Sequence, residues 1–265
     1  MPRPRSFHAR YGPTALVAGA SEGLGAAFAH GLARRGLDLM IVARRAEPLE
    51  QTARALRQEY GVRVHAAAMD LAQPDTLTSM RVIARDFDVG LVVFNAALAP
   101  VGPFIEEDPE TLMRVVDINV RGPVALARTF APPMIARGHG GLVLMSSLAG
   151  GQGTPRVATY AASKAFNTVL GEGLWHELRQ GGVDVLASCA GAIATPGYAR
   201  VGATARPAPG TLAPSVVAER TLDALGRGPR VTPGWINALA AFIVGRLLPR
   251  RLAIAVMAAS TRELT

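Results

Sequence analysis

Short apolar segments alternate with longer amphipathic segments along most of the chain. The apolar runs lie at 14–18, 37–43, 62–69, 90–94, 141–145 and 183–188. Between them, apolar residues recur with helical spacing at 26–35, 48–60, 75–85, 110–137 and 158–180, and a further helix is expected at 213–225. Continuous apolar runs separated by amphipathic helices are typical of strands that helices bury on both faces. The pattern therefore predicts an α/β fold in which helices cover a parallel sheet.

Glycines follow the first apolar run. The segment Gly19-Ala20-Ser21-Glu22-Gly23-Leu24-Gly25 separates the expected strand from the helix. Glycine lets the backbone approach a ligand, and the N-terminus of the helix offers free N–H groups and a positive dipole end to a pyrophosphate. The alternative is a turn that serves only tight packing of strand and helix. Because of its position, we interpret the turn as a cofactor site formed by Gly19, Ser21, Gly23, Leu24 and Gly25.

The end of the second expected strand bears on the choice of cofactor. An acidic residue about 20 residues past the glycines binds the 2′-hydroxyl of NAD. The sequence has Ala43-Arg44-Arg45 there instead. Two guanidinium groups without a carboxylate favour a 2′-phosphate, so we expect NADPH rather than NAD, bound through Arg44 and Arg45. The alternative is two solvated loop arginines, and a Glu22 side chain that points inward would oppose the phosphate.

Polar residues stand at the ends of the later strands, where parallel sheets bind their ligands. Asp70 and Leu71 follow the third strand, and Asp70 is equally compatible with an adenine contact and with a turn or helix cap. Asn95-Ala96-Ala97 opens the loop after the fourth strand, at the edge that lines the ligand crevice, so a further cofactor contact is expected there; the alternative for Asn95 is a simple turn residue. Ser147 ends the fifth strand, where its hydroxyl can polarise a carbonyl oxygen or simply terminate the strand.

One long helix is expected at 110–137, with Asn119 and Pro123 inside it. Proline has no N–H and clashes with the carbonyl four residues back, which here belongs to Asn119. The sequence therefore predicts a kink and a backbone acceptor at Asn119 that is free to hold a water. Pro123 is equally compatible with a simple bend around the sheet.

Tyr160 and Lys164 are four residues apart, so on a helix they project from one face. Lys164 is the only lysine among 28 basic residues, and its compact ammonium differs from the planar guanidinium of arginine. A nearby ammonium favours the phenolate, so we expect a lowered pKa for Tyr160 and a role as acid and base near neutral pH. Taken alone, the spacing favours a surface tyrosine beside a solvated lysine, and the functional interpretation depends on the other motifs.

In this order and at these separations, the glycine turn, Asn119, Ser147 and Tyr160-x-x-x-Lys164 resemble the short-chain dehydrogenase/reductase family, from about residue 13 to residue 196. The resemblance implies a Rossmann-like, doubly wound parallel sheet flanked by helices, with a small helical extension at the C-terminus. It places the family's catalytic residues at Asn119, Ser147, Tyr160 and Lys164. It also implies that Gly191 and Thr195 contact the cofactor, the threonine through the nicotinamide amide.

The resemblance implies a role for each catalytic residue. Ser147 would hold the substrate oxygen, and Tyr160 would give it a proton as hydride arrives from NADPH. Lys164 would bind the nicotinamide ribose and lower the tyrosine pKa, and the Asn119 carbonyl would hold a water that connects the lysine to solvent. The sequence departs from the family pattern at three positions, Ala18, Ala97 and Ala190. These departures affect the rigidity of the cofactor loops and the affinity for the cofactor more than they affect the chemistry.

Composition argues against several other classes. One cysteine, Cys189, excludes an internal disulfide, and the five histidines form no H-E-x-x-H pattern, so no metal site is expected. The formal net charge is +8, and the part from Val185 onward carries nine arginines against three acidic residues. These arginines are not interleaved with aromatic residues, so nucleic-acid binding is not expected. The basic start is followed by no uninterrupted apolar stretch, so we expect a cytoplasmic protein.

The last third of the chain holds two further features. Residues 195–215 are rich in Ala, Pro and Gly and are expected to form a mobile substrate lid, with Arg200 and Arg206 either on an anionic substrate or solvated. Residues 235–260 are apolar but are split by arginines and a proline at 246–251, which favours two short helices over a membrane span. We place these helices first in an oligomer interface or a pocket wall, and second on an anionic membrane surface.

Together these features predict a single-domain, homo-oligomeric enzyme (a dimer or tetramer) that uses NADPH to reduce the carbonyl of a fairly apolar substrate. One alternative is an alcohol dehydrogenase of the same family that works in the oxidative direction. Another is a cofactor-binding or membrane-associated protein without turnover. The intact set of Ser147, Tyr160 and Lys164 argues against the last alternative.

Overall fold

The computed structural model describes residues 6–73, 75–83, 86–200 and 208–262. The strands of this part of the chain are β1 (Thr14–Ala18), β2 (Asp38–Ala43), β3 (Val64–Ala68), β4 (Val89–Phe94), β5 (Gly140–Ser147), β6 (Val183–Ala190) and β7 (Arg230–Val231). They form one sheet in the order β3-β2-β1-β4-β5-β6-β7, and every neighbouring pair is parallel. The strand order reverses direction between β1 and β4. The predicted doubly wound, Rossmann-like sheet is therefore confirmed.

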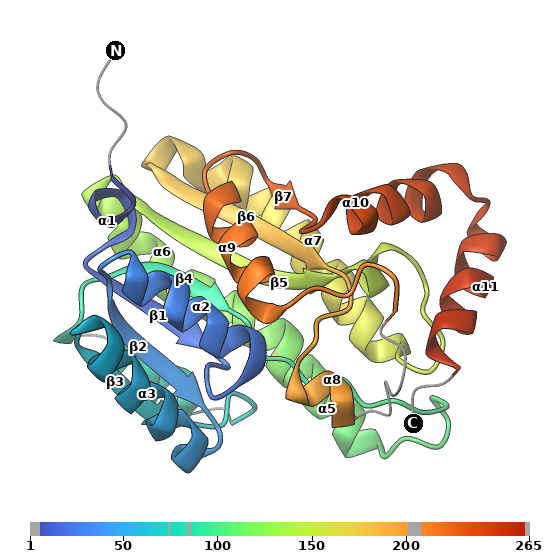
Figure 1. The fold of residues 1–265 in the computed structure, drawn as a ribbon, viewed down its shortest axis with the longest axis horizontal. Coiled ribbons are helices and arrows are strands. Elements are labelled where there is room, and N and C mark those ends of the chain that lie inside the picture. Colours follow the sequence, from blue (N-terminus) through green and yellow to red (C-terminus); the bar gives the residue numbers. More distant parts are fainter. Residues whose placement is uncertain (1–5, 74, 84–85, 201–207, 263–265) are drawn as a thin grey trace.

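Helices cover both faces of the sheet (Figure 1). They are α1 (Phe7–Tyr11), α2 (Gly23–Arg34), α3 (Ala46–Tyr60), α4 (Thr76–Ile83), α5 (Pro109–Val116), α6 (Gly122–Arg137), α7 (Ala158–Leu178), α8 (Pro196–Arg200), α9 (Pro214–Ala224), α10 (Trp235–Phe242) and α11 (Arg250–Thr261). The apolar pattern locates all of these except α1 and α8, and all of the strands except β7. The three exceptions are too short to show a periodicity.

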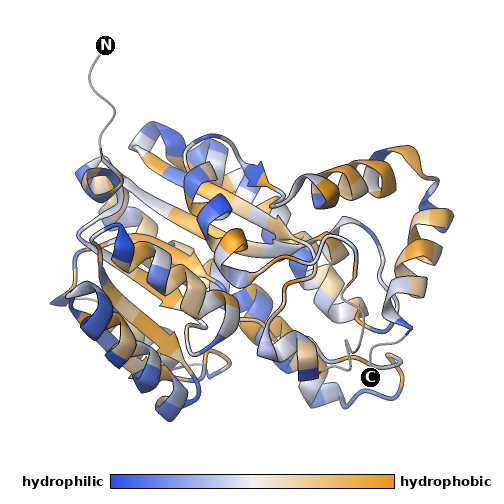
Figure 2. Ribbon diagram, in the orientation of Figure 1, coloured by the Kyte–Doolittle hydropathy of each residue, from blue (hydrophilic) through white to orange (hydrophobic). Residues whose placement is uncertain are grey.

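An aliphatic core lies on each face of the sheet. Every residue of β1 and β4 is buried, as expected for strands that are covered on both sides. Phe28 of α2 and Leu222 of α9 pack on one face, and Phe130 and Met134 of α6 pack on the other. Figure 2 shows the hydrophobic strands running between helices whose outer surfaces are more polar.

The long helix expected at 110–137 is interrupted where the sequence predicts a break. A π-helical turn (Asp117–Arg121) joins α5 to α6, and in it the Gly122 N–H donates to the Asp117 carbonyl, five residues back. Pro123 has no N–H to offer the Asn119 carbonyl. The break thus takes the form of an extra residue in one helical turn, and the water on the Asn119 carbonyl stays a prediction.

The C-terminal helices α10 and α11 extend from the body of the domain as an arm (Figure 1). A second π-helical turn (Ile243–Leu247) ends α10. The arm returns to the body at α11, where Arg250 donates to the Gly151 carbonyl at 3.0 Å and Thr261 donates to the Pro155 carbonyl at 3.1 Å. Within the described residues, no helix is both long and apolar enough to cross a membrane.

Candidate active site

Most of the predicted site residues lie at the carboxyl ends of the strands or on α7 beside them, and Asn119 lies in the π-helical turn between α5 and α6. The glycine turn joins β1 to α2, Arg44 and Arg45 follow β2, and Asp70 and Leu71 follow β3. Asn95, Ala96 and Ala97 follow β4, Ser147 ends β5, Tyr160 and Lys164 lie in the first turns of α7, and Gly191 and Thr195 follow β6. The parallel sheet therefore gathers along one edge residues that are far apart in the sequence. The middle of the predicted lid, 201–207 with Arg206, lies outside the described residues.

Tyr160, Ser147 and Lys164 form one cluster. The Ser147 hydroxyl lies near enough to the Tyr160 hydroxyl to favour the phenolate of Tyr160. The ammonium nitrogen of Lys164 lies 5.5 Å from the centroid of the Tyr160 ring and donates to the Met145 carbonyl of β5 at 3.0 Å. Lys164 is only 2% exposed, so its charge is held inside the protein. The backbone carbonyl of Met145 as its acceptor is a partner that sequence reasoning missed.

The pKa of Tyr160 corrects the expectation drawn from the sequence. Burial raises this pKa, and the hydrogen bond with Ser147 offsets the rise only in part. The predicted lowering is therefore wrong in this structure, because the surrounding protein disfavours the phenolate and the nearby ammonium is directed at the Met145 carbonyl. Burial lowers the pKa of Lys164 to about 8. Tyr160 is thus a neutral phenol at physiological pH, which is the form that donates a proton.

The Asn119 side chain clamps the loop after β4. It is fully buried, its Oδ1 accepts from the Leu98 N–H at 2.9 Å, and its Nδ2 donates to the Leu98 carbonyl at 2.9 Å. The same Nδ2 donates to Ser163 Oγ of α7 at 3.0 Å. Sequence reasoning identifies only the backbone carbonyl of Asn119 and misses Ser163. The available signal is an amide on the apolar face of an amphipathic helix, in register with Val115 and Leu126, because a buried amide requires partners.

The geometry of the glycine turn is compatible both with a packing role and with cofactor binding. Gly19 has φ +83°, and a Cβ there would lie 2.7 Å from the backbone of Ala96, while a Cβ at Gly25 would lie 1.9 Å from the Gly19 carbonyl. Packing alone therefore requires these two glycines. The N-terminus of α2 has no side-chain cap from Glu22, so its first N–H groups remain available, and this fits the pyrophosphate of a dinucleotide. Asn95 supports the turn by donating from Nδ2 to the Gly19 carbonyl at 3.0 Å.

Arg45 is engaged by Glu22 rather than solvated. One oxygen of the Glu22 carboxylate lies 2.8 Å from Arg45, and the other lies 2.6 Å from Arg200 of α8. Partial burial raises the pKa of Glu22, but the hydrogen bonds from the two arginines outweigh burial and leave the pKa below its usual value. The carboxylate is therefore ionised, and it points toward one of the two arginines assigned to the 2′-phosphate. Arg44 is exposed.

The remaining cofactor candidates have structural partners of their own. Asp70 accepts from the Ala72 N–H and forms an ion pair with Arg114, so it acts as a turn residue, and the adenine contacts of Asp70 and Leu71 stay predictions. Thr195 Oγ1 accepts from the Tyr198 N–H at 3.1 Å and so caps α8. A Cβ at Gly191 would lie 2.7 Å from Oδ1 of Asn237, a buried residue that sequence reasoning missed.

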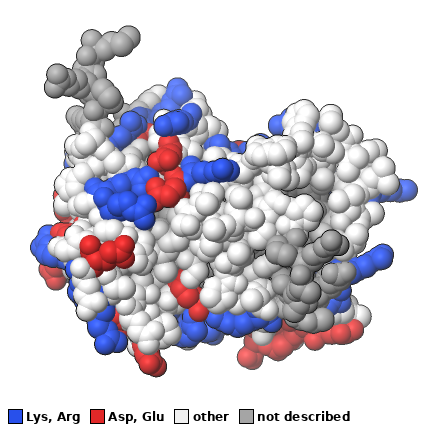
Figure 3. Space-filling view, in the orientation of Figure 1, with Lys and Arg blue, Asp and Glu red and all other residues white. Residues whose placement is uncertain are grey.

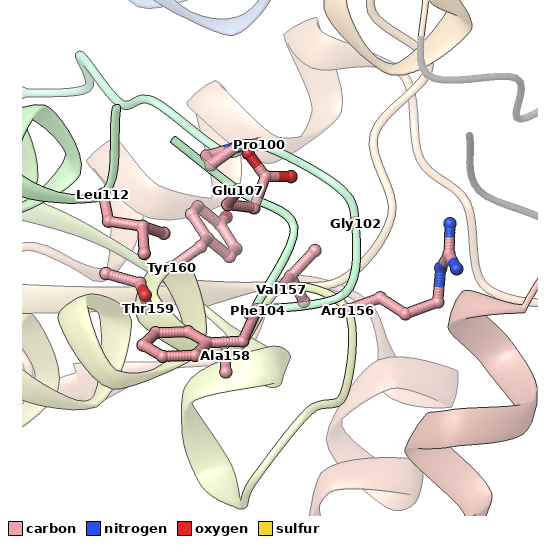
Figure 4. Close-up of a pocket in the computed structure, with 10 residues that line it drawn as sticks. All are labelled: Pro100, Gly102, Phe104, Glu107, Leu112, Arg156, Val157, Ala158, Thr159 and Tyr160. Atoms are coloured by element: carbon pink, nitrogen blue, oxygen red, sulfur yellow. The ribbon is translucent and has the colours of Figure 1, made fainter. Parts of the chain in front are cut away.

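A pocket opens beside Tyr160 (Figure 4). The side chains of Phe104, Leu112 and Val157 give it an apolar lining, and Glu107 adds a carboxylate. In Figure 4 the Tyr160 ring lies next to Glu107, whereas Arg156 extends away from the ring. The pocket is small, about 20 Å³, and Thr159 and the Tyr160 phenol also line it, so it marks one wall of a site beside the tyrosine.

Comparison with known proteins identifies the family. Residues 13–205 match the family model described as short chain dehydrogenase. The chain belongs to this family. It is therefore an oxidoreductase of the short-chain dehydrogenase type, as the order and spacing of its motifs predict.

Two curated relatives and one solved structure resemble the chain over most of its length. The chain is 32% identical over 191 residues to 7beta-hydroxysteroid dehydrogenase of Clostridium sardiniense, covering 72% of this chain and 73% of that protein. It is 31% identical over 248 residues to a very-long-chain 3-oxoacyl-CoA reductase-like protein of Arabidopsis thaliana, covering 92% and 79%. A short-chain dehydrogenase from Sphingobium yanoikuyae, solved in complex with NADPH, superposes with a TM-score of 0.79 at 32% identity, covering 85% and 89% of the two chains.

Proposed function

We propose that this short-chain dehydrogenase is an NADPH-dependent carbonyl reductase for a fairly apolar ketone or aldehyde. The observation that carries the proposal is the grouping of Ser147 and Lys164 around Tyr160, whose side chain lines the pocket. Two hydroxyl groups that converge on one point can bind and protonate a carbonyl oxygen. The raised pKa of Tyr160 supports the reductive direction, because it keeps the phenol protonated.

The proposed mechanism assigns one step to each residue. When bound, a reduced nicotinamide supplies the hydride that the carbonyl carbon accepts. Ser147 Oγ accepts from the Ala149 N–H at 3.2 Å, and its own hydrogen, which otherwise favours the Tyr160 phenolate, can donate to the substrate oxygen when a substrate is bound. Tyr160 transfers its proton to the same oxygen, so that C=O becomes CH–OH, and the nearby Lys164 charge stabilises the phenolate that remains. The Asn119 side chain holds the loop after β4 against α7.

The choice of NADPH rests on the end of β2. Arg44 and Arg45 follow this strand, and no acidic residue follows it there to bind the 2′-hydroxyl of NAD. The related Sphingobium enzyme was solved with NADPH. The cofactor contacts proposed from the sequence, from Gly19 to Thr195, all lie along the edge of the sheet where a dinucleotide would bind.

The proposed substrate class rests on the pocket and on the relatives. Phe104, Leu112 and Val157 offer contact to hydrocarbon rather than to hydroxyl groups. The relatives are named for a hydroxysteroid and for a very-long-chain 3-oxoacyl-CoA, and the steroid skeleton and the long acyl chain are both bulky and apolar. We therefore expect a bulky ketone rather than a sugar.

A substrate screen with both cofactors tests this proposal. Steroid ketones, long-chain 3-oxoacyl thioesters and ketoses are each incubated with NADPH or NADH, and the absorbance of the reduced nicotinamide is followed. The corresponding alcohols with the oxidised cofactors report the reverse reaction. We expect NADPH-dependent turnover of the bulky ketones. Binding of NADPH without turnover of any substrate would favour the non-catalytic alternative, and equal rates with NADH would overturn the cofactor assignment.

We also propose that the arm formed by α10 and α11 docks on a second copy of the chain. Large apolar side chains are exposed along it, among them Trp235 (74%) and Leu247 (62%). The arm also carries several arginines, and the sequence from 232 to 262 contains no acidic residue. The segment 104–110 has the complementary character, because Phe104 and Ile105 are exposed next to four acidic residues. Figure 3 shows only basic and uncharged surface over the arm on the face in view. A basic apolar arm and an acidic apolar segment on one chain suit a two-fold symmetric pair.

Oligomer measurements separate this proposal from membrane contact. Light scattering after gel filtration should give a dimer or a larger assembly that is lost or weakened in Trp235→Ser/Leu247→Ser. Val169→Ser, which removes an exposed apolar residue of α7 outside the arm, is the control. An unchanged assembly together with flotation of the wild-type protein on anionic liposomes would favour the membrane alternative instead.

A further inference from the structure

Glu22 stands between two arginines that come from different parts of the chain. Arg45 follows β2, and Arg200 ends α8, 178 residues after Glu22 in the sequence. Each arginine has its own carboxylate oxygen, at 2.8 Å and 2.6 Å respectively. The three side chains are all partly exposed, so they can exchange partners when a ligand arrives.

This ion-paired group connects two sides of the cofactor crevice. The glycine turn that carries Glu22 adjoins the start of α8, because a Cβ at Gly23 would lie 3.1 Å from the Thr195 methyl group. Thr195 in turn caps α8 through the Tyr198 N–H. Arg200 therefore links α8 to the turn after β1 through Glu22. Glu22 also contacts Arg45, which is proposed to bind the 2′-phosphate, so α8 is linked to that arginine as well.

The charges determine how the group responds to the cofactor. A 2′-phosphate is attracted by Arg45 and repelled by Glu22, so the carboxylate competes with the phosphate for one guanidinium. Arg200 weakens this competition, because it holds the second carboxylate oxygen and compensates the negative charge. Without Arg200, Glu22 would interact with Arg45 alone.

We infer that Glu22 tunes the affinity for NADPH over NADH by competing with the 2′-phosphate for Arg45, and that Arg200 of α8 relieves this competition. The inference rests on the proposed use of NADPH and concerns a residue pair outside the proton-transfer group. Its consequence is a coupling between α8 and the far end of the cofactor. While Arg200 shares the carboxylate, Glu22 competes less strongly for Arg45 and the 2′-phosphate is held more tightly; without Arg200, the full charge of Glu22 acts on Arg45 and the phosphate is held less tightly.

A double-mutant cycle on cofactor binding tests the coupling. The dissociation constants of NADPH and NADH are measured by calorimetry for the wild type, Glu22→Gln, Arg200→Gln and the double variant. Glu22→Gln should bind NADPH about three- to tenfold more tightly, a modest range because the groups are partly exposed, and should leave NADH unchanged. Arg200→Gln should weaken the binding of NADPH by a similar factor. This effect should disappear when Glu22→Gln is also present.

The control is Arg63→Gln, which removes one positive charge from an ion pair with Asp38 at the opposite end of β2. It should leave both dissociation constants unchanged. An effect of Arg200→Gln that persists without Glu22, or a Glu22→Gln variant that binds NADPH more weakly, would overturn the inference while leaving the NADPH assignment intact. A wild-type protein that does not prefer NADPH would overturn the proposed cofactor itself.

Discussion

The Lys164 ammonium lies 5.5 Å from the Tyr160 ring centroid, yet its hydrogen bond goes to the Met145 carbonyl at 3.0 Å. The lysine is thus anchored on β5 and places its charge beside the ring without a bond to the phenol oxygen. This arrangement leaves the phenol neutral and would place the ammonium beside the phenolate that the proposed proton transfer leaves behind.

Tyr160→Phe should abolish turnover and leave NADPH binding within about twofold of the wild type. The substitution removes the proposed proton donor but keeps the ring that packs beside Lys164. Steady-state reduction of the best ketone from the screen measures the first effect, and calorimetry with NADPH measures the second. A Tyr160→Phe enzyme with near-normal kcat would show that another group supplies the proton.

Lys164→Met should change the way stability depends on pH. The pKa of Lys164 is about 8 in the folded protein and 10.5 as an unperturbed side chain. Between these values the unfolded chain binds a proton that the folded chain does not, so the wild type gains stability as pH rises through this window. The free energy of unfolding of Lys164→Met minus that of the wild type should therefore fall by up to about 3 kcal/mol from pH 7 to pH 10.5.

Urea unfolding followed by circular dichroism at several pH values measures this difference. Groups other than Lys164 titrate in both proteins, so they cancel in the comparison. A difference that stays constant from pH 7 to pH 10.5 would contradict the lowered pKa of the buried lysine.

Arg44→Ala should weaken the binding of NADPH about tenfold or more and the binding of NADH less than twofold. The loss corresponds to about 1.4 kcal/mol or more from a charge-assisted hydrogen bond to the 2′-phosphate. Arg54→Ala, an exposed position on α3, serves as the control for loss of one positive charge. Equal losses for both cofactors would show that Arg44 does not read the phosphate.

Asn119→Leu should destabilise the protein by about 1–3 kcal/mol, because it leaves the partly buried N–H and carbonyl of Leu98 without their partner. Ser163→Ala removes only the third bond of the clamp and should cost clearly less. Thermal unfolding of the two variants measures the contrast. Equal losses would indicate that the link to α7, rather than the bonds to Leu98, carries the stabilisation.

Much of the fold follows from the sequence because the strands are buried on both faces. The residues of β1 form a continuous apolar run that ends at glycine, so its limits, Thr14 and Ala18, coincide with the expected ones. Asn119 and Pro123 likewise mark the position of the helical break. The form of that break is not visible in the sequence, because a π-helical turn depends on how the helix seats against its neighbours.

The errors and omissions in the site arise from contacts between distant segments. The direction of the Tyr160 pKa shift depends on burial and on a backbone carbonyl that receives the lysine, and neither is visible in a Tyr-x-x-x-Lys spacing. The sequence shows Glu22 as a charge that could oppose a phosphate, but its partner Arg200 is remote in the chain. Such pairings are set by packing, and local patterns carry no signal for them.

Burial of the only lysine determines how the folded protein reacts with amine-modifying reagents. Lys164 is 2% exposed, so reagents that acylate lysine side chains find no target on the folded surface. Covalent labelling of this residue would require α7 to separate from β5. The rate of labelling would therefore report how often the catalytic core opens, and no engineered probe would be needed to follow it.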